Sequence, residues 1–425
     1  MREFSKILLK SYISMENSEL NIAVVIEKLG YVRIGTNYYK LVERPNTDGS
    51  KERKLISWTV ECIKADNGKD FVAKIPKLDG FCLFPNHFEF QKVVGNFYNL
   101  YHEFNYKPIE GDWEITKNFI THIFGEHYEL GLDYLKLLLE KPLQKLPILC
   151  LVSKQRNTGK TTFLNYLKAI FGKNMSVNTN EEFNSNFNDD WVASLLIAID
   201  ETFLERKQDS ERIKNLSTAL KYKSEAKNKD RNEVEFFAKF ILCSNNEDTF
   251  VYIEPNETRY WIRKVEPFEQ ENIYLLDQLK LEIPAFLHFL VNRELSTQNE
   301  TRMWFKPSQI RTPSLIKLIR RNRSKLELEM YDAIQHIMDS KSIENISFCT
   351  MDLLNWLTAR GMKNVLSVQI KQHLQTDWEI KPSSNSNAYT QYTILPNGNI
   401  YERKNRGRFY QISHQFLNKL NENDE

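Results

Sequence analysis

Apolar and polar residues follow different spacings along the chain, and these spacings predict its domains. Residues 1–110 alternate short apolar and polar stretches around turns, which predicts an N-terminal α+β domain. Residues 111–147 carry the apolar spacing of helices until two prolines interrupt it. From 148 to 305, short apolar strands alternate with helices, which indicates an α/β domain. Residues 306–425 begin with a basic stretch and form a last domain.

The last domain has the pattern of a winged helix. One long helix is predicted from Ser314 to Met338, a second begins at Thr350 and a third at Ser367. Asn397-Gly398 is a strong hairpin signal. Four cations near this hairpin could contact DNA phosphates: Arg403, Lys404, Arg406 and Arg408. The alternative is a winged helix that serves only for packing or protein contacts.

The third predicted helix of this domain has one apolar and one polar side. Ile370 and Leu374 are four residues apart and should face the core. Lys371, Gln372 and Gln375 then occupy the polar side, where they could face a major groove.

Composition narrows the class of protein only a little. Hydrophobic residues make up 41% of the 425 residues and charged residues 27%, which indicates a globular chain. The net charge of +2 is too small to indicate a nucleic-acid surface, so any such surface must be local. No apolar run approaches the ~20 residues that span a bilayer. The five cysteines are far apart, and we expect free thiols in a cytoplasmic protein.

The stretch "LPILCLVSKQRNTGKTTFLNYLKAIFG" has the order that a phosphate-binding loop requires. A continuous apolar strand is followed by a polar loop, Gly159-Lys160-Thr161, and an amphipathic helix that ends at Gly172. Backbone N–H groups in such a loop converge on phosphate oxygens. The predicted nucleotide-binding residues are Ser153, Gln155, Arg156, Asn157, Thr158, Gly159, Lys160, Thr161 and Thr162.

The loop lacks the first glycine of the usual G-x-x-x-x-G-K pattern. Lys154 stands in that place, and Ser153 could serve only if the loop were one residue longer. An ordinary strand-to-helix turn is therefore the alternative for this stretch taken alone.

Two later strands end in residues that a metal-dependent NTPase needs. "WVASLLIAIDETF" ends in Asp200-Glu201, about 40 residues after Lys160. Asp200 and Thr161 would hold Mg²⁺, and Glu201 would polarise the attacking water. "FFAKFILCSNNED" ends in Asn245-Asn246, where an amide could bind both the γ-phosphate and that water. A solvated acidic turn and a plain asparagine turn are the alternatives.

Two sets of cationic residues are also candidates for function. One set follows the strand that ends in Asn245-Asn246, and the other lies between that strand and the one that ends in Asp200-Glu201. Arg259 or Arg263 could act as an arginine finger on a neighbouring subunit, or could simply pair with Glu257 or Glu266. The segment "LKYKSEAKNKDRNEVEFFAKF" could be a hairpin whose tip contacts single-stranded DNA, or a solvated charged loop. Its candidate DNA-binding residues are Lys227, Lys229 and Arg231.

The order of these motifs resembles that of the superfamily 3 helicases, which are AAA+-related hexameric motors of viruses, phages and mobile elements. The resemblance covers roughly Asp112 to Phe305, and the helicase half of phage and prophage primase-helicases is the most similar group. It implies Walker A roles for Lys160 and Thr161, and Walker B roles for Asp200 and Glu201. It also implies an AAA+-like P-loop core over residues 148–305.

The same resemblance assigns the remaining residues. Asn245, less surely Asn246, takes the sensor 1 position. Lys227 and Lys229 lie where the DNA-contacting hairpin of the family lies, and Arg263 or Arg259 falls where an arginine finger is expected. No paired-carboxylate strand or zinc-cysteine set occurs in the first 110 residues, so we expect no primase activity in this chain, and a separate primase is a possible partner.

The function that follows is an ATP- and Mg²⁺-dependent DNA helicase, expected to be a hexamer that acts in phage or mobile-element replication in a bacterial host. A DNA-binding ATPase switch, such as a replication initiator or a defence sensor, is the second candidate. A small-molecule kinase is a third, but the sequence shows no acceptor-binding lid. The task of the N-terminal domain is open.

Overall fold

The structure is a computed structural model of the chain, and it describes residues 22–47, 49, 51–185, 188, 191–204, 207–224, 232–253, 257–322, 325–363, 365–395 and 398–422. The chain divides into two compact units. The first comprises residues 1–202, 211–245 and 263–309, and the second comprises 203–210, 246–262 and 310–425. None of the helices in the described residues is long and apolar enough to cross a membrane.

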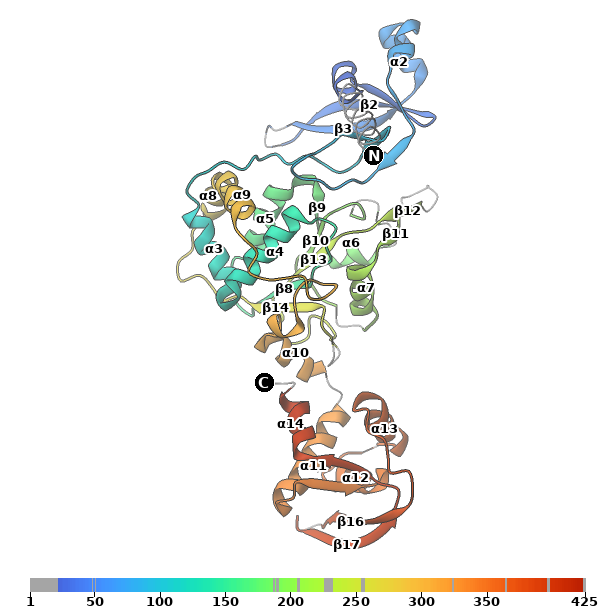
Figure 1. Cartoon of the computed structure of the whole chain (residues 1–425), viewed down its shortest axis with the longest axis vertical. Coiled ribbons are helices and arrows are strands. Elements are labelled where there is room, and N and C mark those ends of the chain that lie inside the picture. The colour runs from blue at the N-terminus through green and yellow to red at the C-terminus, as the bar shows by residue number, and fades with distance from the viewer. Residues whose placement is uncertain are drawn as a thin grey trace, which may run out of the picture. The chain divides into compact units, whose positions relative to one another are not determined.

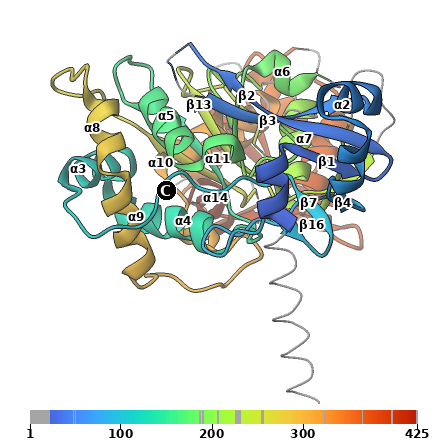
Figure 2. The same cartoon turned by 90° about the horizontal axis from the view of Figure 1, so that it is seen from above.

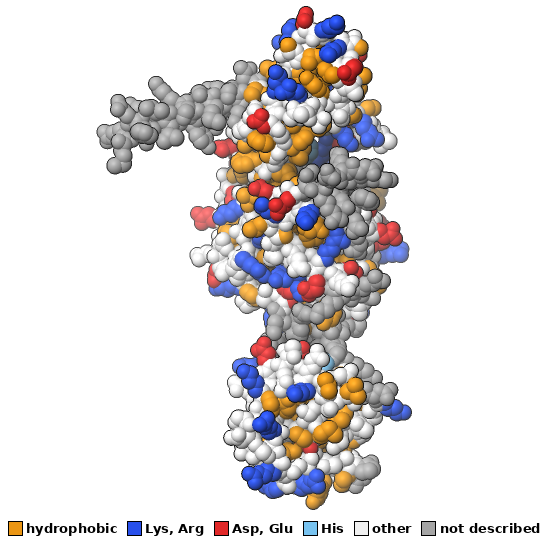
Figure 3. Space-filling view, turned by 90° about the vertical axis from the view of Figure 1, so that its right-hand side faces the viewer, with side chains coloured by type: hydrophobic (Ala, Val, Ile, Leu, Met, Phe, Trp, Pro, Cys, Tyr) orange, Lys and Arg blue, Asp and Glu red, His pale blue; other side chains and the backbone are white. Residues whose placement is uncertain are grey.

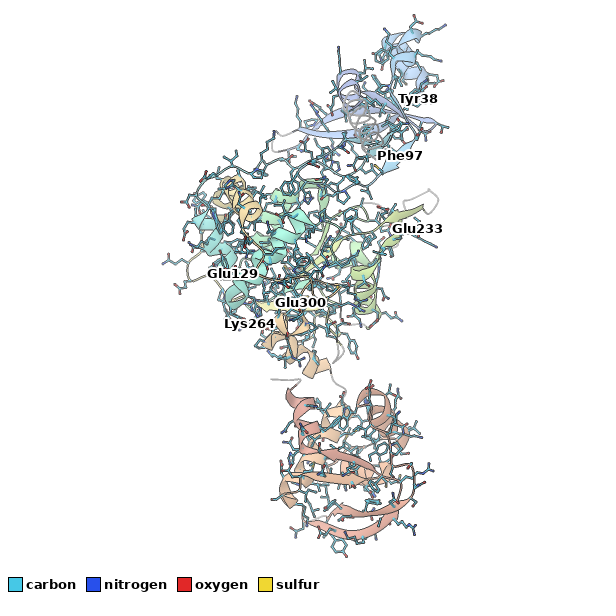
Figure 4. The ribbon with its side chains drawn as sticks, in the orientation of Figure 1. Tyr38, Phe97, Glu129, Glu233, Lys264 and Glu300 are labelled. Atoms are coloured by element: carbon cyan, nitrogen blue, oxygen red, sulfur yellow. The ribbon has the colours of Figure 1, made fainter. Side chains whose placement is uncertain are left out.

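The N-terminal region of the first unit is built on a small mixed sheet. Its order is β3-β2-β1-β4, from β1 (Tyr31–Ile34), β2 (Asn37–Pro45), β3 (Lys51–Trp58) and β4 (Lys77–Leu78). Strands β2 and β3 form an antiparallel hairpin, which carries Tyr38 in Figure 4. Helix α2 (Val60–Asn67), the segment η1 (Lys69–Lys74) and a second sheet complete the region, with β5 (Gly80–Cys82), β6 (Val93–Val94) and β7 (Phe97–Asn99).

A five-stranded sheet forms the centre of the first unit. Its order is β14-β8-β13-β10-β9, from β8 (Ile148–Val152), β9 (Met175–Asn178), β10 (Leu196–Ile199), β13 (Lys239–Ser244) and β14 (Tyr260–Lys264). β8, β13, β10 and β9 are parallel. β8, β10 and β13 are buried along their whole length, as the continuous apolar runs predict. Because β13 lies between β8 and β10, their carboxyl ends are neighbours at one edge of the sheet.

Helices lie on both sides of this sheet. Figures 1 and 2 show α3 (Glu114–Phe124), α4 (Tyr128–Glu140), α5 (Lys160–Phe171), α8 (Leu275–Leu281) and α9 (Ile283–Asn292) together on one side, with α6 (Asn180–Asn184) and α7 (Lys207–Thr218) on the other. The helical spacing expected within residues 111–147 therefore corresponds to two helices, α3 and α4. It breaks at Gly125, whose φ of 50° permits the turn.

A two-stranded hairpin, β11 (Lys221–Ser224) paired with β12 (Asn232–Glu235), projects from the side of α6 and α7 (Figure 1). Figure 4 labels Glu233, which forms an exposed ion pair with Lys221 across the hairpin at 3.4 Å. The predicted tip residues Lys227, Lys229 and Arg231 lie outside the described residues.

The second unit ends in a domain with its own core. Its elements are α11 (Lys325–Lys341), β15 (Asn345–Phe348), α12 (Thr350–Ala359), α13 (Ser367–Gln372), η5 (His373–Asp377), β16 (Asn387–Ile394), β17 (Ile400–Gly407), β18 (Tyr410–Ser413) and α14 (His414–Glu422). Trp356, Ile370 and Leu374 are fully buried in the core, as predicted for the latter two. Of the long helix expected from 314 to 338, the structure describes the helical residues of α10 (Pro313–Asn322) and α11, and residues 323–324 between them lie outside the described part of the chain.

Candidate nucleotide-binding site

The loop between β8 and α5 has the backbone that a phosphate-binding loop needs. Gly159 precedes α5 with a φ of 82°, a conformation that side chains rarely adopt. A Cβ there would also lie 2.9 Å from the Phe268 ring and 3.1 Å from the Phe119 ring. Only glycine fits this position.

The missing glycine has a structural explanation. Lys154 does not adopt a positive φ, whereas Asn157 does, with a φ of 56°. Asparagine tolerates the left-handed region better than most residues do. The chain therefore makes its second left-handed position with Asn157, and the loop does not depend on a glycine at 154.

Two aromatic residues, His122 and Phe268, contact the backbone of the loop between β8 and α5. His122 on α3 stacks on Phe268 with ring centroids 4.2 Å apart, and its Nε2 lies 3.1 Å from the Thr158 carbonyl oxygen. The Phe268 N–H donates to the Asn157 carbonyl at 2.9 Å. The sequence analysis missed both residues because neither belongs to a motif.

The structure brings the loop and the strand that ends at Asp200 together. The Thr161 hydroxyl donates to Asp200 Oδ2 at 3.2 Å, although 39 residues separate them. Lys160 is buried, and its ammonium donates to the Thr158 hydroxyl at 3.0 Å. The fold thus places Thr161 within hydrogen-bond distance of Asp200, with Lys160 adjacent in the chain.

Glu201 follows Asp200 in an unusual conformation. Its φ is 54°, which is uncommon for a residue with a long side chain. Its N–H donates to Asp200 Oδ1 at 3.0 Å, and its carbonyl accepts a hydrogen bond from Asn180 Nδ2 at 2.7 Å. The side chain is exposed at the strand tip. Such strain is kept only where surrounding contacts hold the backbone.

The two asparagines after β13 have different surroundings. Asn245 is exposed directly beyond the strand, where Ser244 pairs with Val152 of β8. The Asn246 side chain accepts from the N–H groups of Asp248 and Thr249 and donates to the Thr249 hydroxyl. Asn246 therefore stabilises a turn, and Asn245 is the better candidate for contact with a bound nucleotide.

The two candidate arginines are also distinguished by their partners. Arg263 is 6% exposed and pairs with Glu126 of the same chain through both terminal nitrogens, not with Glu266. Its hydrogen bond lowers the pKa of the Glu126 carboxyl. Arg259 forms a longer pair with Glu257, at 3.5 Å, and its side chain is 23% exposed. Arg259 is thus the more accessible of the two.

A third strand tip contributes an asparagine that the sequence analysis missed. Asn178 ends β9, and its carbonyl accepts from the Asp200 N–H at 3.3 Å. The residue is 5% exposed, and its Nδ2 lacks a hydrogen-bond partner in the described part of the chain. Because a buried amide normally has a partner, this donor is suited to a ligand or water at the site. The polar run that follows the strand in "SVNTN" was the available signal.

The donors at this edge fit a nucleotide with magnesium. Mg²⁺ prefers oxygen ligands and usually takes few from the protein, the others coming from phosphates and water. Thr161 and Asp200 supply one hydroxyl and one carboxylate next to the loop. Among the described residues no group of three or more His, Cys, Asp or Glu could hold a metal ion by itself.

The four cations of the C-terminal hairpin divide between its two faces. Arg403 pairs with Gln391 in the β16–β17 register and donates to its side chain at 2.7 Å. Lys404 and Arg406 lie on the opposite face because side chains alternate along a strand. Arg408 follows the strand and is exposed. Figure 3 shows Lys and Arg side chains gathered at the end of the domain that β16 and β17 form.

Comparisons with known proteins identify a shared fold. A family of unknown function (DUF5906) matches residues 151–263, and no curated protein matches the chain. The apo structure of the C-terminal region of NrS-1 (residues 305–718) is 13% identical, with a TM-score of 0.63 over 92% of this chain and 98% of that one. A second form of that region is 14% identical with the same TM-score and coverage. The chain therefore shares the fold of the NrS-1 C-terminal region, with a parallel sheet at its centre.

Proposed function

We propose that the protein is an ATP- and Mg²⁺-dependent DNA helicase of the superfamily 3 type, with an AAA+-like core. The observation that carries this proposal is the hydrogen bond between Thr161, in the first turn of α5, and Asp200, which directly follows β10. That contact joins the two halves of a nucleotide–metal site that are far apart in the sequence. The motif order, which resembles that of superfamily 3, supports the assignment to a DNA motor.

The residues of the site have distinct roles in this proposal. The N–H groups of the 153–162 loop and the Lys160 ammonium bind the phosphates, and Thr161 and Asp200 hold Mg²⁺. The metal supplies charge neutralisation at the phosphates when it is bound. Glu201 orients and deprotonates the attacking water, and Asn245 positions that water against the γ-phosphate.

The other proposed parts act between subunits and on DNA. Arg259, rather than Arg263, is the proposed arginine finger, because Arg263 is buried in a pair with Glu126. In a ring, which we propose to be a hexamer, the β11–β12 hairpin would contact single-stranded DNA. The C-terminal domain, proposed to be a winged helix, would bind duplex DNA through its basic hairpin. The setting in phage or mobile-element replication rests on the resemblance alone.

A DNA-binding ATPase switch is the second candidate. The same nucleotide site would serve a protein that binds DNA and hydrolyses ATP without unwinding. The Lys404 and Arg406 face of the C-terminal hairpin suits either protein, because phosphate contacts position a protein on DNA whatever follows.

Strand displacement on a forked DNA separates the two candidates. The helicase predicts ATP-dependent unwinding at limiting protein that disappears in Lys160→Ala. ATP hydrolysis without unwinding in the wild-type chain favours the switch. Absence of nucleotide binding in the wild-type chain contradicts both.

A further inference from the structure

The β3-β2-β1-β4 sheet of the N-terminal region (Figure 1) collects cations on one of its two faces. Side chains alternate between faces along a strand, and cross-strand partners share a face. The strands contribute one carboxylate to this face, Glu52, which pairs with Lys173 at 3.0 Å. The strand register assigns five cations to the same face, which we call the basic face: Arg33, Lys40, Arg44, Lys54 and Lys77.

The two faces of the β2–β3 hairpin differ in the partners of their cations. On the opposite face, Arg53 pairs with Glu27 at 2.6 Å and with Glu43 at 3.3 Å. Lys51, also on that face, pairs with Glu43 at 3.4 Å. The five cations of the basic face form no ion pair with another described residue. A cluster of positive charge without counter-ions is suited to a polyanion such as DNA, whose phosphates would neutralise it.

Apolar side chains lie between the cations of the basic face. Tyr38 and Trp58 are cross-strand partners, and both are half-buried. The Lys40 Nζ lies 4.6 Å from the centroid of the Trp58 ring. Ile56, the cross-strand partner of Lys40, is 41% exposed. Rings and apolar side chains among cations suit unpaired bases, because a single strand offers its bases for stacking and a duplex encloses them.

Two buried donors on the same face lack a partner. The Arg33 Nε and the Trp58 Nε1 have no hydrogen-bond partner in the described part of the chain. Buried polar atoms normally have one. Guanidinium and indole nitrogens can only donate, so these two atoms suit an acceptor such as a phosphate oxygen or a base carbonyl. Single-stranded DNA presents both kinds of acceptor.

We propose that the basic face binds a single strand of DNA. The exposed side chains of Arg44, Lys54 and Lys77 contact phosphates, and bases pack against Tyr38 and Ile56. The face belongs to a different sheet from the nucleotide site, so strand binding here needs no ATP. This inference goes beyond the proposed function, because it gives the N-terminal region the task of retaining a strand outside the ATPase core.

The experiment compares two double variants of the full-length chain that each remove one arginine and one lysine from the same hairpin. Arg44→Gln/Lys54→Gln changes the basic face, and Lys51→Gln/Arg53→Gln is the matched control on the opposite face. Fluorescence anisotropy with labelled oligothymidine, without nucleotide, measures affinity at several salt concentrations. At about 0.1 M salt we expect the basic-face variant to bind about 20-fold more weakly, with the slope of log K against log salt reduced by about 1.4. The control should keep the wild-type slope.

A third variant tests the contact with bases. Tyr38→Leu keeps an apolar side chain at this position but removes the ring. It should weaken binding to oligothymidine about fivefold without changing the salt slope. Wild-type affinity in this variant overturns the assignment to a single strand, as does a basic-face variant that loses affinity for a blunt duplex but not for oligothymidine.

Equal salt slopes in the two double variants overturn the proposal as a whole. Thermal unfolding of each variant excludes damage to the fold as the cause of weaker binding, because the midpoints should match that of the wild type. The outcome is separable from that of the proposed function. A wild-type chain that unwinds DNA while the two slopes are equal loses only the basic face, whereas a chain that binds no nucleotide but shows different slopes loses only the motor.

Discussion

The central sheet brings together polar residues that are far apart in the sequence, whereas the C-terminal hairpin separates charged residues that are adjacent in the sequence. At the sheet edge, parallel strands bring Thr161, Asp200 and Asn245 to one place although they are far apart in the sequence. In the β16–β17 hairpin, antiparallel pairing puts the adjacent residues Arg403 and Lys404 on opposite faces.

The reason lies in strand geometry. Parallel strands all end at the same edge of a sheet, so their following residues gather there. Side chains alternate between faces along one strand, so a cluster in the sequence is divided in space. Arg403 joins a polar network in which Gln391 also donates to the buried Asp352, while Lys404 donates to the Thr390 hydroxyl at 3.1 Å.

The largest expected effect tests the sheet edge. Glu201→Gln should reduce kcat for ATP about 10³-fold, because the amide cannot accept the proton of the attacking water. Nucleotide binding should persist, and light scattering should show a larger species with ATP. A variant that stays monomeric with and without ATP contradicts the ring, and one with normal turnover contradicts the role of Glu201.

The next effect compares the two asparagines that follow β13. Asn245→Ala should lower kcat about 100-fold, the size expected for loss of one donor at a reacting group. Asn246→Ala should instead lower the free energy of unfolding by about 1 kcal/mol, because it removes turn hydrogen bonds. Turnover and urea unfolding of both variants check the assignment, which fails if Asn246→Ala has the larger effect on kcat.

The hairpin faces can be compared through the salt dependence of DNA binding. Lys404→Ala together with Arg406→Ala should reduce the slope of log K against log salt by about 2, since each phosphate contact contributes nearly one unit. Arg403→Ala should change the slope by less than about 1, because its guanidinium is engaged with Gln391. Titrations at several salt concentrations measure both, and equal slopes for the two faces would remove the distinction between them.

The smallest expected effect concerns the glycine-poor loop. Asn157→Val should weaken ATP binding about fivefold, because a branched residue resists the left-handed conformation by about 1 kcal/mol. Asn157→Gly should bind ATP as tightly as the wild type or more tightly. Calorimetry with a nonhydrolysable analogue compares them, and equal affinity in the valine variant would show that the bound loop changes conformation.

The sequence predicted the elements of the core well because their signals are local. The apolar run at Ile148–Val152, the helix after Gly159 and its end at Gly172 all follow from spacing and glycine placement. Asn178, Asn180 and His122 could not be assigned, since their roles depend on segments that only folding brings near. The sequence pattern did not predict the break at Gly125, because the apolar spacing continues from α3 into α4.

The sequence by itself indicated the three buried strands β8, β10 and β13, the loop with its lysine, and the acidic pair after β10. The tertiary structure alone decided that Arg263 pairs with Glu126, that Asn246 belongs to a turn, and that Asn180 holds Glu201. The physical reason is that local patterns record which residues are buried or capped, whereas the partner of a polar side chain depends on how distant segments pack.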